Sequence, residues 1–127
     1  SKIAGQDQTV DRILKGTGST LTAADLEFYK ELMRSRSHIG ATLQMMAQWD
    51  LEPLLARLPR LQTETHLIAS SNDLAVPCAT SQRAAALLPN ADYQALPNLG
   101  HLAHEEDAAT IAACIAPMLD LGCASGT

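Results

Sequence analysis

Two side chains that could share a proton, Asp73 and His101, each follow a short apolar run of the sequence. A carboxylate held against an imidazole fixes one tautomer of the ring and stabilises the imidazolium that forms when the histidine removes a nucleophile's proton. Such chemistry needs both groups on loops that converge. Short apolar runs are typical of buried parallel strands, whose carboxyl ends lie at one edge of a sheet. Asp73 and His101 are therefore candidates for the acid and the base of one catalytic pair, and ordinary surface or loop-capping roles for the two residues are the alternative that stays open at this point.

The strands that must position this pair are predicted at residues 65–70 and 93–96, with a helix of small residues over 79–88 between them. A final helix over 108–119 follows, and Pro117 should end or bend it early. The pattern indicates a parallel strand–helix–strand–helix unit whose first strand is buried on both faces. Two strands leave an open sheet edge. We expect a preceding segment or another chain to cover it, and self-association of the chain if nothing else does.

The part of the chain before the first strand shows helical periodicity throughout. Thr22 and Asp25 have the spacing of a capping box, and Ser37 can cap the helix that follows. The predicted helices span residues 8–15, 22–35, 37–50 and 51–58. The chain thus divides into a helical segment over residues 1–60 and a strand–helix unit over residues 61–127.

Three large apolar side chains, Met45, Met46 and Trp49, share one broad face of the helix predicted over residues 37–50. Methionine adapts to irregular apolar surfaces, so this face could line a pocket for a flat apolar ligand such as a tetrapyrrole. The alternative is ordinary packing of the helix on the rest of the protein. Both interpretations stay open on the sequence alone.

The charge distribution argues against nucleic acid as a partner. The 127 residues carry a net charge of −5, and residues 61–127 hold one basic residue against seven acidic ones. No basic patch interleaved with aromatic residues is present to attract a phosphate backbone. The apolar runs are far shorter than the roughly 20 residues of a membrane-spanning helix, and the first residues lack the apolar stretch of a secretory signal. We therefore expect a cytoplasmic protein without a transmembrane segment.

No metal or cofactor is predicted. His101, His104 and Glu105 do not have the H-E-x-x-H spacing of zinc enzymes, and no third ligand is placed beside the two histidines. His38 could reach a porphyrin metal, but a histidine at a helix start is more often solvated. Cys78 has no adjacent base that would activate its thiol. The three cysteines, Cys78, Cys114 and Cys123, also lack metal or redox spacing and are expected to be free.

The two loops that carry the acid and the histidine resemble those of α/β-hydrolases. The string Asn72-Asp73-Leu74-Ala75-Val76-Pro77 is similar to the D-x-x-V-P acid loop, and Gly100-His101-Leu102-Ala103-His104-Glu105 is similar to the G-H-x-x-x-x-E histidine loop. The resemblance implies the C-terminal portion of an α/β-hydrolase fold, without its N-terminal strands. Residues 1–60 would be the helical lid and residues 61–127 the last part of the core, with Asp73 as triad acid and His101 as triad base.

Three further stretches are similar to one branch of that superfamily, the magnesium chelatase accessory proteins of bacteriochlorophyll synthesis. They are residues 17–21, 45–51 and 99–106. The resemblance covers essentially the whole chain but only the C-terminal half of the family's length. It implies a hydrolase-like protein that has magnesium chelatase as a partner and a small apolar molecule or a tetrapyrrole as a ligand.

The sequence departs from this family because it lacks a nucleophile. No G-x-S-x-G motif is present, and Ser19, in Gly16-Thr17-Gly18-Ser19-Thr20, has the wrong register and follows no strand. The oxyanion-hole segment is absent as well. We therefore expect the chain alone to be inactive toward p-nitrophenyl esters. Two alternatives stay open, a generic esterase or haloperoxidase-like serine hydrolase and a non-catalytic protein that binds a porphyrin or a protein partner.

Overall fold

A two-stranded parallel sheet is the centre of the fold in the computed structural model, which describes residues 2–119. Strand β1 (Thr65–Ser70) pairs with β2 (Ala91–Leu96), and the register sets Thr65 opposite Ala91 and Ser70 opposite Leu96. The predicted bounds of β1 are confirmed, whereas β2 begins before its predicted start at Tyr93. The chain is thus a mixed helix and strand structure with a parallel sheet, which is compatible with the predicted α/β class.

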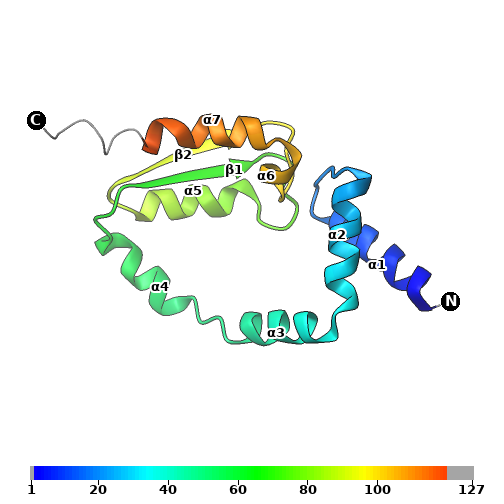
Figure 1. Ribbon diagram of the computed structural model, residues 1–127. Coiled ribbons are helices and arrows are strands. Elements are labelled where there is room, and N and C mark those ends of the chain that lie inside the picture. Colours follow the sequence, from blue (N-terminus) through cyan, green and yellow to red (C-terminus); the bar gives the residue numbers. More distant parts are fainter. Residues whose placement is uncertain (1, 120–127) are drawn as a thin grey trace, which may run out of the picture.

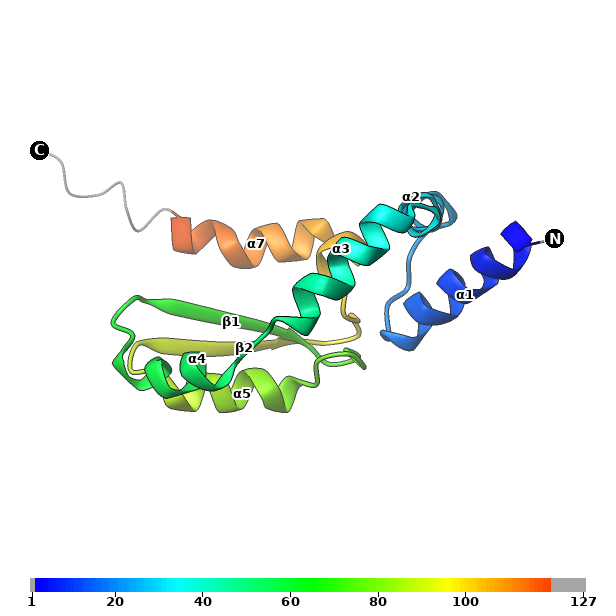
Figure 2. The ribbon, with the colours of Figure 1, turned by 90° about the horizontal axis from the view of Figure 1, so that it is seen from below.

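Helices lie on both faces of this sheet, as the two views show (Figure 1, Figure 2). Helix α5 (Cys78–Leu87) connects the strands and contacts both, and α7 (Ala108–Leu119) lies on the opposite side. An open pocket of about 400 Å³ is lined by residues of β1, α5 and α7. Pro117 lies inside α7, whose described part extends to Leu119, so the proline does not end this helix at once.

The helical segment begins with α1 (Lys2–Gly16) and α2 (Ala23–Arg34). The capping box at the start of α2 is confirmed, because the Thr22 hydroxyl accepts from the Asp25 N–H at 3.3 Å and the Asp25 carboxylate accepts from the Thr22 N–H at 3.2 Å. Each side chain thereby satisfies a backbone donor that the first turn of a helix leaves unpaired.

Ser35, and not Ser37, caps the next helix, α3 (Arg36–Ala47), so the prediction of a Ser37 cap is wrong. Ser35 has the extended backbone that a cap requires, and its hydroxyl accepts from the His38 N–H at 3.3 Å. Because α2 ends at Arg34, Ser35 is the first residue free to take that conformation. Ser37 lies within the first turn of α3.

Helix α3 ends at Ala47, so the predicted extension to residue 50 is also wrong. The N–H groups of Gln48 and Trp49 bond to carbonyls three residues earlier, which closes the helix and leaves Trp49 beyond it. Helix α4 (Glu52–Arg57) and the 3-10 turn η1 (Leu58–Arg60) complete the segment. In Figure 1, α3 and α4 form an arch that runs from the end of α2 round to the start of β1; residues 36–57 of this arch are called the arm below.

Burial is concentrated at the end of the sheet that carries the two loops. The buried apolar residues are Val10, Leu14, Ala69, Leu88, Leu96 and Ala103. Along β1 only Ala69 and Ser70 are buried and the earlier residues are half-buried, so burial on both faces is confirmed only at the C-terminal end of this strand. No helix within residues 2–119 is long and apolar enough to cross a membrane.

Candidate acid–base site

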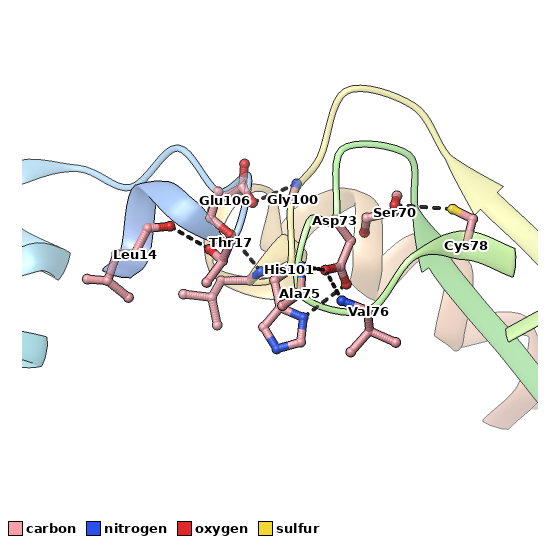
Figure 3. A network of polar contacts seen from close by, with 12 residues as sticks. Leu14, Thr17, Ser70, Asp73, Ala75, Val76, Cys78, Gly100, His101 and Glu106 are labelled. Atoms are coloured by element: carbon pink, nitrogen blue, oxygen red, sulfur yellow. Dashed lines mark hydrogen bonds and ion pairs between the residues drawn. The ribbon is translucent and has the colours of Figure 1, made fainter. Parts of the chain in front are cut away.

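Asp73 and His101 meet beyond the carboxyl ends of β1 and β2. The ring nitrogen Nδ1 of His101 lies 2.9 Å from Asp73 Oδ2, as Figure 3 shows. The Asp73 side chain is 12% exposed and the His101 side chain 39%. The sheet therefore brings the two loops together as the strand order predicts, and leaves the imidazole accessible from solvent.

The second carboxylate oxygen of Asp73 is fixed by the backbone of its own loop. Oδ1 accepts from the Ala75 N–H at 2.9 Å and from the Val76 N–H at 2.7 Å (Figure 3). Burial favours the neutral acid, but the hydrogen bonds from Val76, His101 and Ala75 outweigh it, and the pKa of Asp73 is lowered. Asp73 is thus an oriented carboxylate, and with Nδ1–H of His101 as donor, Nε2 is the nitrogen left to accept a proton.

The acid loop and the histidine loop are also hydrogen-bonded to each other. The N–H groups of Ser71 and Asn72 donate to the carbonyls of Leu96 and Leu99, each at 2.9 Å. The Asn98 N–H donates to the Ser71 hydroxyl at 2.9 Å. Asn98 has φ 63°, a left-handed conformation that asparagine tolerates better than most residues. These bonds extend the strand pairing into the loops and limit how far the loops can separate.

A turn of the helical segment, residues 17–20, packs against both loops. The Thr17 carbonyl accepts from the Leu74 N–H at 3.1 Å and from the His101 N–H at 3.3 Å. Gly18, with φ +80°, allows the chain to approach this closely. One carbonyl therefore connects the backbones of the acid and histidine loops.

Ser19 lies in this 17–20 turn, as predicted, and it follows no strand. Its hydroxyl oxygen accepts from the Leu102 N–H at 2.9 Å, the residue after His101. This contact was not predicted from the sequence. The local feature that could have indicated this contact is Gly100, because a residue without a side chain lets two backbones come into contact.

Glu106 stands at the glutamate position of the G-H-x-x-x-x-E pattern counted from Gly100, but no role was predicted for it. It ends the short helix α6 (Ala103–Glu106), which was not predicted. Its Oε1 accepts from the Gly100 N–H at 2.9 Å and its Oε2 accepts from the Thr20 N–H at 3.0 Å. One carboxylate thus joins the histidine loop to the 17–20 turn.

The neighbouring residue, Glu105, connects α6 to α2. The Tyr29 hydroxyl donates to Glu105 Oε1 at 2.5 Å, and burial together with this hydrogen bond raises the pKa of Tyr29 to about 12. His104, 64% exposed, lies with Nε2 3.6 Å from the same Glu105 oxygen. Within residues 2–119, no group of three or more His, Cys, Asp or Glu side chains is placed to hold a metal.

The open pocket lined by β1, α5 and α7 lies beside the acid–base pair. Asp73 and His101 line it together with apolar side chains that include Ile68, Ile111 and Ile115. Because α5 and α7 lie on opposite faces of the sheet, this apolar pocket runs along the free edge of β1, which we expect another segment or chain to cover. Met45, Met46 and Trp49 do not line this pocket, because they lie on the arm.

Cys78 begins α5 next to the acid loop, and its thiol donates to the Ser70 carbonyl at 3.2 Å (Figure 3). A carbonyl oxygen does not stabilise a thiolate, so this contact gives the sulfur no activation. Cys78 and Cys114 are free and half-buried, as expected, and Cys123 lies outside the described residues.

Comparison with known proteins gives one informative similarity. No family model matches the chain. Over 105 residues it is 38% identical to the magnesium-chelatase 30 kDa subunit of Rhodobacter capsulatus, an alignment that covers 83% of this chain and 37% of that protein. The chain therefore spans little more than a third of the relative's length. The match supports the predicted link to magnesium chelatase, whereas membership of the α/β-hydrolase superfamily stays a prediction.

Proposed function

We propose that Asp73 and His101 are the acid and base of a Ser-His-Asp triad whose nucleophile lies outside these 127 residues. The observation that supports this most directly is the 2.9 Å contact between His101 Nδ1 and Asp73 Oδ2, with the other carboxylate oxygen fixed by two backbone N–H groups. The carboxylate of a Ser-His-Asp triad has this geometry because it must hold the imidazole in one tautomer. In this proposal residues 1–60 form the lid of an α/β-hydrolase and residues 61–127 the end of its core.

The proposed mechanism uses the free nitrogen of His101. Nε2 takes the proton from the nucleophile's hydroxyl, and the Asp73 carboxylate stabilises the imidazolium that results. The same nitrogen later returns the proton to the leaving group.

The biological role we propose is that of an accessory protein acting with magnesium chelatase in the cytoplasm during bacteriochlorophyll synthesis. The similarity to the magnesium-chelatase 30 kDa subunit over 105 residues supports this role. No resident metal or cofactor is part of the proposal.

The test is hydrolysis of p-nitrophenyl esters by the full-length protein and by the 127-residue chain. We expect the chain alone to be inactive and His101→Gln to reduce kcat of the full-length protein by about 10³- to 10⁴-fold. His38→Gln is the control, because His38 is exposed on the arm. Turnover by the chain alone, or full activity of His101→Gln, would overturn the proposal, and broad activity unrelated to pigments would favour a generic esterase or haloperoxidase-like enzyme.

A non-catalytic binding role is the second candidate, and the exposure of the arm favours it. Met45, Met46 and Trp49 are 53%, 49% and 59% exposed, so they are available to a flat apolar ligand or a protein partner. Trp49 is the only tryptophan, and its fluorescence reports binding directly. A magnesium porphyrin should quench it in the full-length protein, and equally in the His101→Gln variant. Unchanged fluorescence would exclude tetrapyrrole binding at this face.

A further inference from the structure

We propose that Glu106 is a positioning residue for His101, because its carboxylate joins the histidine loop to the 17–20 turn and thereby holds the imidazole against Asp73. The inference rests on the proposed function, since a positioned imidazole matters only where the pair works. It adds to the site a residue that does not touch a substrate and acts through the backbone next to the base.

The two contacts of Glu106 are on different segments of the chain. Oε1 accepts from the Gly100 N–H at 2.9 Å, and Oε2 accepts from the Thr20 N–H at 3.0 Å. Gly100 is buried and directly precedes His101. A buried N–H that loses its acceptor is costly, and hydrogen bonds to a charged carboxylate are stronger than those to a neutral group. Glu106 therefore secures the residue before the catalytic base.

The N–H groups of His101 and Leu102 complete the same arrangement. They donate to the Thr17 carbonyl at 3.3 Å and to the Ser19 hydroxyl at 2.9 Å. Three successive N–H groups, centred on His101, are thus held either by the 17–20 turn or by Glu106. The Glu106 carboxylate also binds this turn, so its loss releases one of the three bonds directly and loosens the support for the other two.

The chain supplies a matched control at the next position. Glu105 has the same charge and lies on the same short helix, but its carboxylate accepts from the Tyr29 hydroxyl on α2 and not from the histidine loop. Glu105→Gln therefore removes an equal charge beside the site and leaves both Glu106 contacts in place. If the two variants, Glu106→Gln and Glu105→Gln, affect His101 differently, the difference comes from the lost contacts of Glu106 and not from the lost charge.

The experiment is nitrogen NMR of the full-length protein, which reads the His101 tautomer and amide hydrogen exchange at Gly100 without any reaction. We expect the wild type to show the Nδ1–H tautomer bonded to a carboxylate. Glu106→Ala should mix the two tautomers and speed exchange at Gly100 about fivefold or more. Glu106→Gln, which keeps one acceptor oxygen and the side-chain volume, should give a smaller change and carries the test if the alanine variant does not fold. Glu105→Gln should match the wild type.

An unchanged tautomer and unchanged Gly100 exchange in the folded Glu106 variants would overturn the inference. So would equal changes in Glu105→Gln. Failure of the proposed function gives a different result, in which His101→Gln leaves activity of the full-length protein intact while the Glu106 variants still alter the imidazole signals.

Discussion

The backbones of Gly18 and Gly100 pack directly against each other, so position 100 has no room for a side chain. A Cβ on Gly100 would lie 2.4 Å from the carbonyl carbon and oxygen of Gly18, and a Cβ on Gly18 would lie 1.8 Å from the Asn72 carbonyl oxygen. The obstructing atoms are backbone and cannot rotate away. The 17–20 turn is therefore fitted between the acid and histidine loops.

Gly100→Ala should destabilise the protein by about 1 to 3 kcal/mol, because the added methyl group must push two loops apart. Denaturation by urea measures the change. Gly40→Ala is the control, since Gly40 lies inside α3 with nothing within 4 Å of a Cβ there. It should raise the free energy of unfolding by about 0.5 to 1 kcal/mol through helix propensity. Wild-type stability of Gly100→Ala would show that the loops do not touch the turn.

Asp73→Asn should lower the free energy of unfolding by an amount that depends on pH. The folded protein lowers the pKa of Asp73, so the ionised carboxylate contributes stability that is fully present above the ordinary pKa of 3.8 and is lost as the pH falls through the lowered value. The difference in unfolding free energy between wild type and variant should be constant near neutral pH and shrink below about pH 4. Urea titrations over this range measure it. A difference that does not vary with pH would mean that the folded state does not perturb this carboxyl group.

Ser35→Ala should destabilise α3 by about 1 kcal/mol, whereas Ser37→Ala should have little effect. The Ser35 hydroxyl accepts from the His38 N–H, whereas Ser37 caps no backbone N–H and its exposed hydroxyl lies 3.1 Å from that of Ser35. The two variants remove the same atom two residues apart, so each controls for the other. A larger loss from Ser37→Ala in thermal unfolding followed by circular dichroism would restore the original prediction of a Ser37 cap.

Elements whose formation depends on residues close together in the chain could be predicted from the sequence. The apolar run over residues 65–70 and the Thr22–Asp25 capping box each depend on neighbouring residues, and both are confirmed. The choice between Ser35 and Ser37 could not be predicted, because both residues can cap and the end of the preceding helix decides between them. Four residues of α6 are too few to show periodicity.

The contacts that hold the acid–base site in place could not be predicted either, and the reason is different. Convergence of Asp73 and His101 follows from the order of parallel strands, which the sequence indicates. The Glu106 contact with Thr20 joins residues 86 positions apart and depends on how the helical segment folds back on the loops. No spacing rule relates such residues. Contacts between distant segments therefore show what Glu106 does, whereas residue type and position identify the acid–base pair.

The measurement that tests the central claim most directly is labelling of the full-length protein with a serine-reactive fluorophosphonate, followed by mass spectrometry. The probe reacts only with a serine that a working base activates. We predict one labelled serine outside residues 1–127 in the wild type and loss of that label in His101→Gln. No labelled serine, or equal labelling of wild type and His101→Gln, would contradict the assignment of Asp73 and His101 as a triad acid and base.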